Sequence, residues 1–171
     1  MFAPALLTGL APAVAEDARV LVLGSMPGAA SLAQQQYYAH PRNAFWPIMS
    51  RLLGMAPGLP YPQQLAALNR HGVALWDVIA YCQRQGSLDS AIRQEKPNDF
   101  CQFFAAQHKI AVIAFNGGKA WSSFKRHVLP LAVVPPHIKL LTLPSTSPAH
   151  VSLNFEQKLK QWQQLNTFLS S

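Results

Sequence analysis

The chain has 171 residues, half of them apolar, which fits one globular domain with a full hydrophobic core and excludes an intrinsically disordered chain. Fourteen Lys and Arg residues against seven Asp and Glu residues give a formal net charge of +7 and a pI near 9.8. This excess favours a polyanionic partner, most often a nucleic acid, although a basic soluble protein without such a partner has the same composition. No apolar run reaches the ~18 residues of a membrane span, so no membrane association is expected.

The first 18 residues, MFAPALLTGLAPAVAEDA, share the apolar character and the AVA triplet of a secretory leader. They have no Lys or Arg ahead of the apolar part, and Pro4 and Pro12 interrupt it, which argues against a leader. Cys82 and Cys101 lack the C-x-x-C spacing of a metal site, and we interpret them as reduced thiols rather than as one disulfide. These features predict a cytoplasmic protein.

Four short apolar runs predict buried strands. Their character is nearly continuous rather than alternating, as expected of parallel strands that are covered on both faces. The runs are RVLVLG (19–24), VALWDV (73–78), IAVIAF (110–115) and IKLLTL (138–143).

Helical patterns separate these runs: AFWPIMSRLLG (44–54), PQQLAALNRHG (62–72), NDFCQFFAAQH (98–108) and KAWSSFKRHVL (119–129). A last pattern places apolar residues at helical spacing from Phe155 to Leu169, and Ser152 is expected to cap it. The alternation of strands and helices predicts a single domain over residues 1–171. Its expected fold class is α/β, a three-layer α/β/α sandwich around a mostly parallel four-stranded sheet.

In such a sheet, ligands bind beyond the carboxyl ends of the strands. The segments that follow the four runs mix turn-forming and polar residues, as loops that line a cleft do. They are GSMPGAAS (24–31), WDVIAYC (76–82), FNGGKAW (115–121) and LPSTSPAH (143–150).

Several familiar catalytic schemes find no match in these loops. Gly117-Gly118-Lys119 lacks the spacing of a phosphate loop, and GSMPG is not the G-x-S-x-G nucleophile elbow. The histidines and cysteines show no zinc-site spacing, so we expect no metal and no cofactor. A serine hydrolase that uses Ser25 or Ser145 is the weakest alternative, because no Ser-His-Asp pattern supports it.

The remaining polar groups suit the binding of a planar heterocycle. In QYYAHPRNAFWPI (36–48), an arginine and an asparagine lie among aromatic residues, a mixture that indicates a pocket wall. An asparagine amide reads a base edge with two hydrogen bonds, and an aromatic ring stacks on a base face, contributing roughly 1–3 kcal/mol. A basic surface binds the flanking phosphates.

The ordered set GSMPG, YAHPRNAFW, FNGGKAW and LPSTSPAH resembles the uracil-DNA glycosylase superfamily, specifically its hypoxanthine-DNA (deoxyinosine) glycosylase branch. The resemblance spans about residues 19–150. The related mismatch-specific uracil/thymine branch begins with G-x-N-P-G and continues with F-A-x-P-x-N-R-F-W. The resemblance implies a DNA glycosylase, which we expect to be a monomer. No lysine of the matched loops stands at a recognised catalytic position, so we expect a monofunctional enzyme that does not cleave the strand. Such an enzyme flips a deaminated base, in this branch hypoxanthine, out of DNA and hydrolyses its N-glycosidic bond.

Two positions depart from the superfamily pattern. Met26 stands where the mismatch branch has its water-positioning asparagine, and Leu143 stands where the last motif has His or Asn. Both departures weaken the prediction of uracil activity. A uracil or mismatch-specific glycosylase of the same fold, and a DNA protein that binds lesions without catalysis, remain as alternatives.

The motif matches also imply roles for individual residues. Asn43 and Asn116 are assigned the catalytic work, by donating to the departing base or by orienting the water. The implied base pocket consists of Gly24, Ser25, Met26, Pro27, Gly28, Tyr38 and Phe45, with Tyr38 aligned with the stacking aromatic of the superfamily. The implied DNA contacts are Arg42, Ser145, Thr146, Ser147 and His150, and Lys119, Lys125 and Arg126 are further phosphate-contact candidates.

Each of the main candidates also has a purely structural interpretation. Asn43 is well suited to cap a helix that begins at Ala44, and Asn116 to form a turn before the two glycines. Asp77 is interpreted as a loop carboxylate that binds backbone N–H groups, with the polarisation of water as its alternative. His150 is either a solvated residue or one that enters the minor groove in place of the flipped base.

Overall fold

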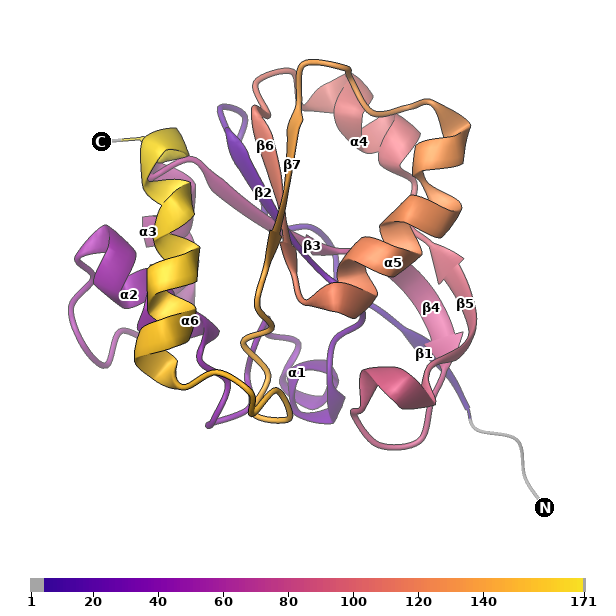
Figure 1. Ribbon diagram of the computed structural model, residues 1–171, viewed down its shortest axis with the longest axis horizontal. Helices are drawn as coiled ribbons and strands as arrows, with labels where there is room; N and C mark the ends of the chain where they lie inside the picture. Colours follow the sequence, from indigo (N-terminus) through magenta and orange to yellow (C-terminus); the bar gives the residue numbers. More distant parts are fainter. Residues whose placement is uncertain (1–4, 171) are drawn as a thin grey trace.

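The computed structural model describes residues 5–170. A four-stranded parallel sheet forms its centre, in the order β3 (Val73–Asp77), β2 (Val20–Gly24), β6 (Val112–Asn116) and β7 (Lys139–Leu143) (Figure 1). Every residue of β2, β3 and β6 is buried. The four predicted strands are therefore confirmed, with ends that shift by one or two residues.

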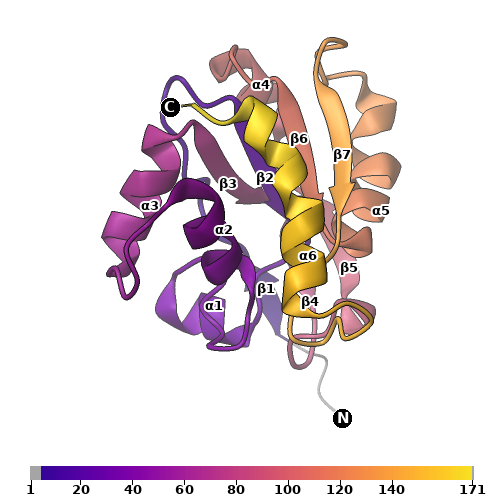
Figure 2. The same ribbon diagram turned by 60° about the vertical axis from the view of Figure 1, so that its left-hand side comes forward.

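Helices cover both faces of this sheet, which confirms the predicted three-layer α/β fold (Figures 1 and 2). One face carries α2 (Phe45–Leu53), α3 (Tyr61–Arg70) and α6 (Phe155–Trp162), and the other carries α4 (Phe100–Ala106) and α5 (Gly118–His127). A short helix, α1 (Ala29–Gln34), lies at the carboxyl ends of the strands.

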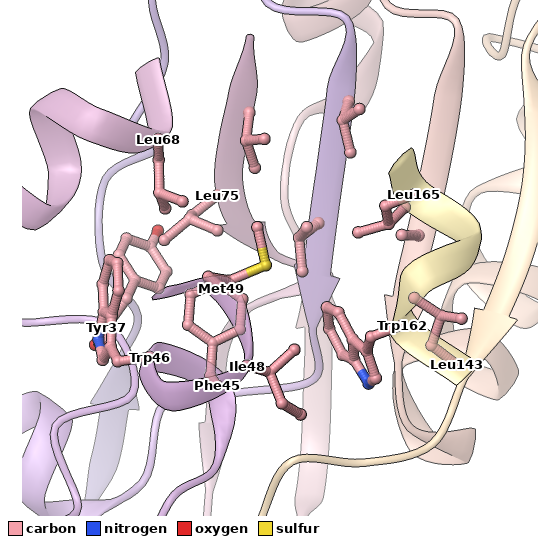
Figure 3. Packing of buried hydrophobic residues seen from close by; sticks show 14 of the residues in the cluster. Tyr37, Phe45, Trp46, Ile48, Met49, Leu68, Leu75, Leu143, Trp162 and Leu165 are labelled. Carbon is pink, nitrogen blue, oxygen red and sulfur yellow. The ribbon is translucent and has the colours of Figure 1, made fainter. Parts of the chain in front are cut away.

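Helix α2 fixes the segment that precedes it, because its apolar side is anchored in the core. Figure 3 shows Phe45, Ile48 and Met49 of α2 lying against the sheet, with Trp162 from α6 beside them. The indole N–H of Trp46 donates to the carbonyl oxygen of Tyr37 at 2.9 Å, as expected of a tryptophan in the core. These contacts hold the start of α2 in the core and join it to the segment before it.

A second sheet was not predicted. It is antiparallel, in the order β1 (Leu6–Thr8), β4 (Ile79–Gln83) and β5 (Arg93–Pro97). Strand β4 follows β3 after Val78 alone, so the segment WDVIAYC (76–82), expected to be a loop that lines the cleft, is mostly strand, and of its residues only Asp77 lines the cavity at the strand ends. Strand β5 reads RQEKP, a polar pattern typical of a loop, and only its pairing with β4 makes it a strand.

Two further findings concern the helices. The cap of α6 is Asn154 and not Ser152: the Asn154 side chain accepts from the backbone N–H of Gln157, and the Gln157 side chain accepts from that of Asn154, both at 2.9 Å. This reciprocal capping box satisfies two otherwise unpaired donors, which Ser152 is placed too early to do.

No helix within residues 5–170 is long and apolar enough to cross a bilayer.

Glu95 lies on β5 of the small sheet and binds side chains of α5, a helix that covers the large sheet. Its carboxylate accepts from Lys119 Nζ and from Ser123 Oγ, the latter at 2.6 Å, and His127 Nε2 lies 3.3 Å away. Burial raises the pKa of Glu95, but the hydrogen bonds from Lys119 and Ser123 and the nearby charges outweigh burial and lower it overall. The charged form is therefore favoured in the folded protein.

We expect Glu95→Gln to lower the free energy of unfolding by about 1 kcal/mol at pH 7, a modest value because solvent screens a partly exposed ion pair. A lowered carboxyl pKa stabilises the fold above the unfolded-state pKa, and this contribution is lost as the pH falls through the folded-state value. Urea unfolding at pH 7 and at pH 3.5 should therefore show the difference between wild type and variant shrinking in acid. An equal difference at both pH values would contradict this account.

Candidate active site

A cavity of about 700 Å³ opens at the carboxyl ends of the central strands. Strands β2 and β6 are neighbours in the sheet, but the chain continues from β2 to β3 on one side before it returns to β6 on the other. The order of the strands therefore reverses between β2 and β6, and in open α/β sheets ligands bind in the crevice beyond the strand ends at such a point. Gly24 and Asn116, the last residues of these two strands, both line the cavity. Its volume lies within the range of small-molecule sites.

Of the three further phosphate-contact candidates, Lys119 lines this cavity, and Lys125 and Arg126 do not. Of the residues assigned to catalysis, to the base pocket and to the implied DNA contacts, all but one line it. The exception is Phe45, which is fully buried and belongs to the core. Phe45 is the first residue of α2, and the direction of that helix turns its ring behind Tyr38, where the two rings stack at 4.1 Å between centroids. The placement of Phe45 in the pocket wall was therefore wrong.

Tyr38 stands on the cavity wall in a left-handed backbone conformation, with φ of 55°. Its hydroxyl group is buried, and no hydrogen bond of standard geometry reaches it from the described residues. Burial, reinforced by the charge of Asp77, raises the pKa of Tyr38 above its ordinary value. Tyr38 is therefore a neutral residue of the cavity wall whose hydroxyl group is buried behind that wall.

The Asn43 side chain supports the start of α2 and still has free amide donors. Its Oδ1 accepts a hydrogen bond from the backbone N–H of Phe45 at 2.9 Å, so the side chain supports the start of α2. The residue at the N-cap position itself is Ala44. Because the oxygen is bound, the amide group presents its Nδ2 donors, which bind no other described residue. Asn43 can therefore donate to a ligand in the cavity.

Asn116 has both amide atoms bound to one residue. Its Oδ1 accepts from the backbone N–H of Thr146, and its Nδ2 donates to Thr146 Oγ1, both at 2.9 Å. Thr146 is buried, and its carbonyl oxygen accepts from the N–H of Ala44 at 2.9 Å. Asn116 thus fixes the loop after β7, and that loop in turn fixes the segment that carries Asn43.

The loop of residues 24–28 is held by residues of the small sheet and of the segments next to its strands. Met26 is buried and packs against Ile79, Cys82 and Ile92. The guanidinium group of Arg84, also buried, donates to the carbonyl oxygen of Pro27. These contacts support the backbone of the loop beside the cavity.

The two candidate nucleophiles of a serine hydrolase are engaged elsewhere. Ser25 Oγ donates to Asp89 Oδ1 at 2.6 Å, and Ser145 Oγ accepts from the N–H of Ser147 at 3.1 Å. Within residues 5–170 neither hydroxyl group is bonded to a histidine. The arrangement gives no support to the serine hydrolase alternative.

Asp77, the last residue of β3, borders the cavity and is only 4 % exposed. The expectation that it binds backbone N–H groups is wrong: Oδ2 is buried without a partner in the described residues, and no backbone N–H donates to the carboxylate. Burial, and secondarily the charge of Asp89, raises the pKa of Asp77 to about 7, although Arg84 opposes the shift.

The family model of the uracil DNA glycosylase superfamily matches residues 11–168. The chain belongs to this superfamily. A protein of Methanosarcina acetivorans named hypoxanthine DNA glycosylase is 40% identical over 110 residues, which are 61% of this chain and 67% of the relative. A Methanosarcina barkeri protein of the same name is 34% identical over 113 residues, 66% of this chain and 72% of the relative. A solution NMR structure from M. acetivorans, provisionally named a uracil DNA glycosylase, superimposes with a TM-score of 0.76 at 31% identity and covers 91% of this chain and 95% of that one.

The residues implied to contact DNA differ in their exposure and in their partners. Of the implied DNA contacts, Arg42 is exposed, whereas Thr146 is buried in the network of Asn116. Lys119 is paired with Glu95, and Lys125 lies over the ring of Trp121, 5.7 Å from its centroid. Of these three basic residues, Arg42 has neither an ion pair nor a ring contact within the described residues.

The sequence interpretation missed two features of this rim. Lys158, a buried lysine of α6, donates to the carbonyl oxygens of Ser147 and His150 and so holds the last loop; its place in an ordinary helical pattern gave no signal. Leu88 is 57% exposed on the cavity rim. A single leucine in a polar segment also gives no signal.

The close approach of Gly24 to Asp77 gives a test of the cavity floor. A Cβ atom on Gly24 would lie 2.5 Å from Asp77 Oδ1 and 3.2 Å from the Tyr38 hydroxyl, so Gly24→Ala should lower the free energy of unfolding by about 1–3 kcal/mol. Gly28→Ala is the matched control, because its Cβ would meet Ser87 Oγ at an ordinary 3.4 Å. Urea unfolding of both variants measures the difference, and equal stabilities would disprove the tight packing.

Proposed function

We propose that this protein is a monofunctional DNA glycosylase, acting as a monomer, that removes deaminated bases in base excision repair. Its first substrate would be deoxyinosine, from which it releases hypoxanthine. The observation that carries this proposal is the cavity at the ends of β2 and β6, where the free amide donors of Asn43 and the side chain of Tyr38 line a space of about 700 Å³, large enough to take a flipped base. The names of the two Methanosarcina relatives point to the same substrate.

The cavity suits a base that has left the duplex. Flipping a nucleotide costs a few kcal/mol of unstacking, which contacts inside the pocket must offset. The Asn43 amide would donate to an acceptor on the base, where negative charge grows as the glycosidic bond breaks. A donor held in place beforehand stabilises that charge without reorganisation. Here the backbone N–H of Phe45 holds the amide, through its oxygen.

The same amide favours hypoxanthine over adenine. Hypoxanthine has a carbonyl oxygen at position 6, whereas adenine has an amino group there. The Nδ2 donors of Asn43, held toward that position, would bind the oxygen of hypoxanthine and would face the amino group of adenine without a bond. Unpaired polar groups in a buried site give strong discrimination.

Uracil is the second candidate substrate, and Met26 argues against it. The mismatch-specific branch has an asparagine at this position, whereas Met26 is buried against Ile79, Cys82 and Ile92 and brings no amide into the loop. The monofunctional assignment rests on Lys119. It is the one lysine among the described residues that line the cavity, and its amine is engaged by Glu95 rather than free for a covalent intermediate.

The decisive experiment incubates purified protein, in excess, with duplexes that carry one inosine, uracil, xanthine or adenine, followed by alkali to cleave abasic sites. We expect strand breaks only after alkali, and fastest with inosine. Release of uracil as fast as hypoxanthine would reassign the substrate. Tight binding to the inosine duplex without base release would support the lesion-binding alternative, and strand breaks before alkali would disprove the monofunctional mechanism.

A further inference from the structure

Asp77 is the buried ionisable group of the cavity to which the proposed function assigns no role. Its carboxyl group lies at the carboxyl end of β3, against the backbone of Gly24, and the hydrogen bond from the N–H of Val78 to the carbonyl oxygen of Gly24 fixes the two strands there. One carboxyl oxygen has no partner in the described residues. A buried polar atom without a partner costs roughly 1–3 kcal/mol, so its presence beside a ligand cavity calls for a reason in function.

The charged groups around Asp77 leave it without a counter-ion. Arg84 is close enough to lower its pKa, but within the described residues no ion pair joins them, and the Arg84 guanidinium instead binds the Pro27 carbonyl. Asp89, which also lines the cavity, is a like charge that raises the pKa of Asp77 further. Tyr38 also lines the cavity and is neutral. The other ionisable groups that line the cavity are His40, Arg42, Lys119 and His150.

We propose that Asp77 is the general acid of the excision reaction: its carboxylic acid donates a proton to a ring nitrogen of the flipped purine as the bond between N9 and C1′ breaks. This role rests on the proposed function. The electron pair of the broken bond passes to the base, which leaves as neutral hypoxanthine, and Asp77 becomes a carboxylate. Water forms the new bond to C1′, and the proton that this water loses returns the carboxylate to its acid form through solvent.

The position of Asp77 suits this step better than that of the other candidates. A general acid needs a pKa near the working pH, and burial together with the charge of Asp89 holds the pKa of Asp77 at about 7. The pKa of Tyr38 is raised far from that range, and Asp89 is exposed and accepts from Ser25. N3 and N7 of hypoxanthine are free acceptors. Uracil has no such ring nitrogen, so an acid at this place favours a purine.

The test uses Asp77→Asn, which keeps the shape of the side chain and removes the transferable proton. We expect the single-turnover rate on an inosine duplex at pH 6 to fall about 100-fold, while affinity for that duplex changes less than threefold. The wild-type rate should fall tenfold per pH unit above pH about 7, and the variant rate should be flat there. A variant with the wild-type rate at pH 6, or with the wild-type pH profile, would overturn the proposal.

Two modified substrates separate proton transfer from a structural role. Duplexes with 7-deazainosine or 3-deazainosine each lack one of the candidate acceptors. On the analogue that lacks the nitrogen protonated by Asp77, the wild-type enzyme should be slow, and Asp77→Asn should be no slower than the wild type. That analogue then identifies the nitrogen that accepts the proton. An equal loss in the variant on inosine and on both analogues would overturn the proposal. If the wild type itself releases no hypoxanthine from inosine, the proposed function fails; if it does and Asp77→Asn matches it, only the role of Asp77 fails.

Discussion

Replacing Asn43 with serine should lower the single-turnover rate of hypoxanthine release by 100-fold to 1000-fold and change the stability only slightly. The Asn43 side chain accepts from the backbone N–H two residues on, that of Phe45, and a serine hydroxyl group can accept the same bond, although more weakly. It cannot supply the amide donors that Asn43 presents to the cavity. The loss of one preset donor to a developing charge has an effect of this size. Rates from alkaline cleavage and urea unfolding measure the two properties.

Asn43→Ala is the matched comparison, because alanine removes the donors and the helix-start hydrogen bond together. We expect its rate to match that of Asn43→Ser and its free energy of unfolding to be lower by about 1 kcal/mol. The two variants thus separate the roles that one side chain combines. A serine variant within threefold of the wild-type rate would leave Asn43 as a helix-start residue alone.

The central sheet could be predicted because its strands are buried on both faces and therefore read as continuous apolar runs. Strand β5 could not, since RQEKP owes its extended conformation to pairing with β4 and to the tether from Glu95 to α5. The residues that donate hydrogen bonds to Glu95 lie up to 28 residues away in the sequence. The propensity of a segment cannot reveal a strand that its partners impose.

The site was predictable in its location and less so in its details. Loops at the carboxyl ends of parallel strands must converge, and the motif matches place most of the named residues there. The direction of Phe45 depends on where α2 begins and how it packs against Trp162, which the local pattern leaves open. Asp77 looked like a structural carboxylate because the sequence does not show whether a backbone N–H reaches it.

Asn116 shows the same limit, because its partner Thr146 lies 30 residues further along the chain. The motif match assigns Asn116 to catalysis, whereas the bonds of its amide make it the anchor of the loop after β7. That anchor also reaches Ala44 and so the neighbouring Asn43. One substitution at this place should therefore disturb both stability and chemistry.

We expect Asn116→Ala to lower the free energy of unfolding by about 2–4 kcal/mol, because two buried polar groups of Thr146 lose their partner at roughly 1–3 kcal/mol each. The rate of hypoxanthine release should fall at least 100-fold, since the loop that positions Asn43 is no longer fixed. Urea unfolding and single-turnover rates of the variant measure both effects.

Thr146→Val is the control, because it keeps the bond from the backbone N–H of residue 146 to Asn116 Oδ1 and removes only the hydroxyl group. If Asn116 acts through the loop, this variant should lose about 1 kcal/mol of stability and less than tenfold in rate. The smaller loss of stability in Thr146→Val should then go with a proportionally smaller loss of rate than in Asn116→Ala. A hundredfold loss of rate in Asn116→Ala at unchanged stability would contradict the anchoring role and assign the amide of Asn116 to the base itself.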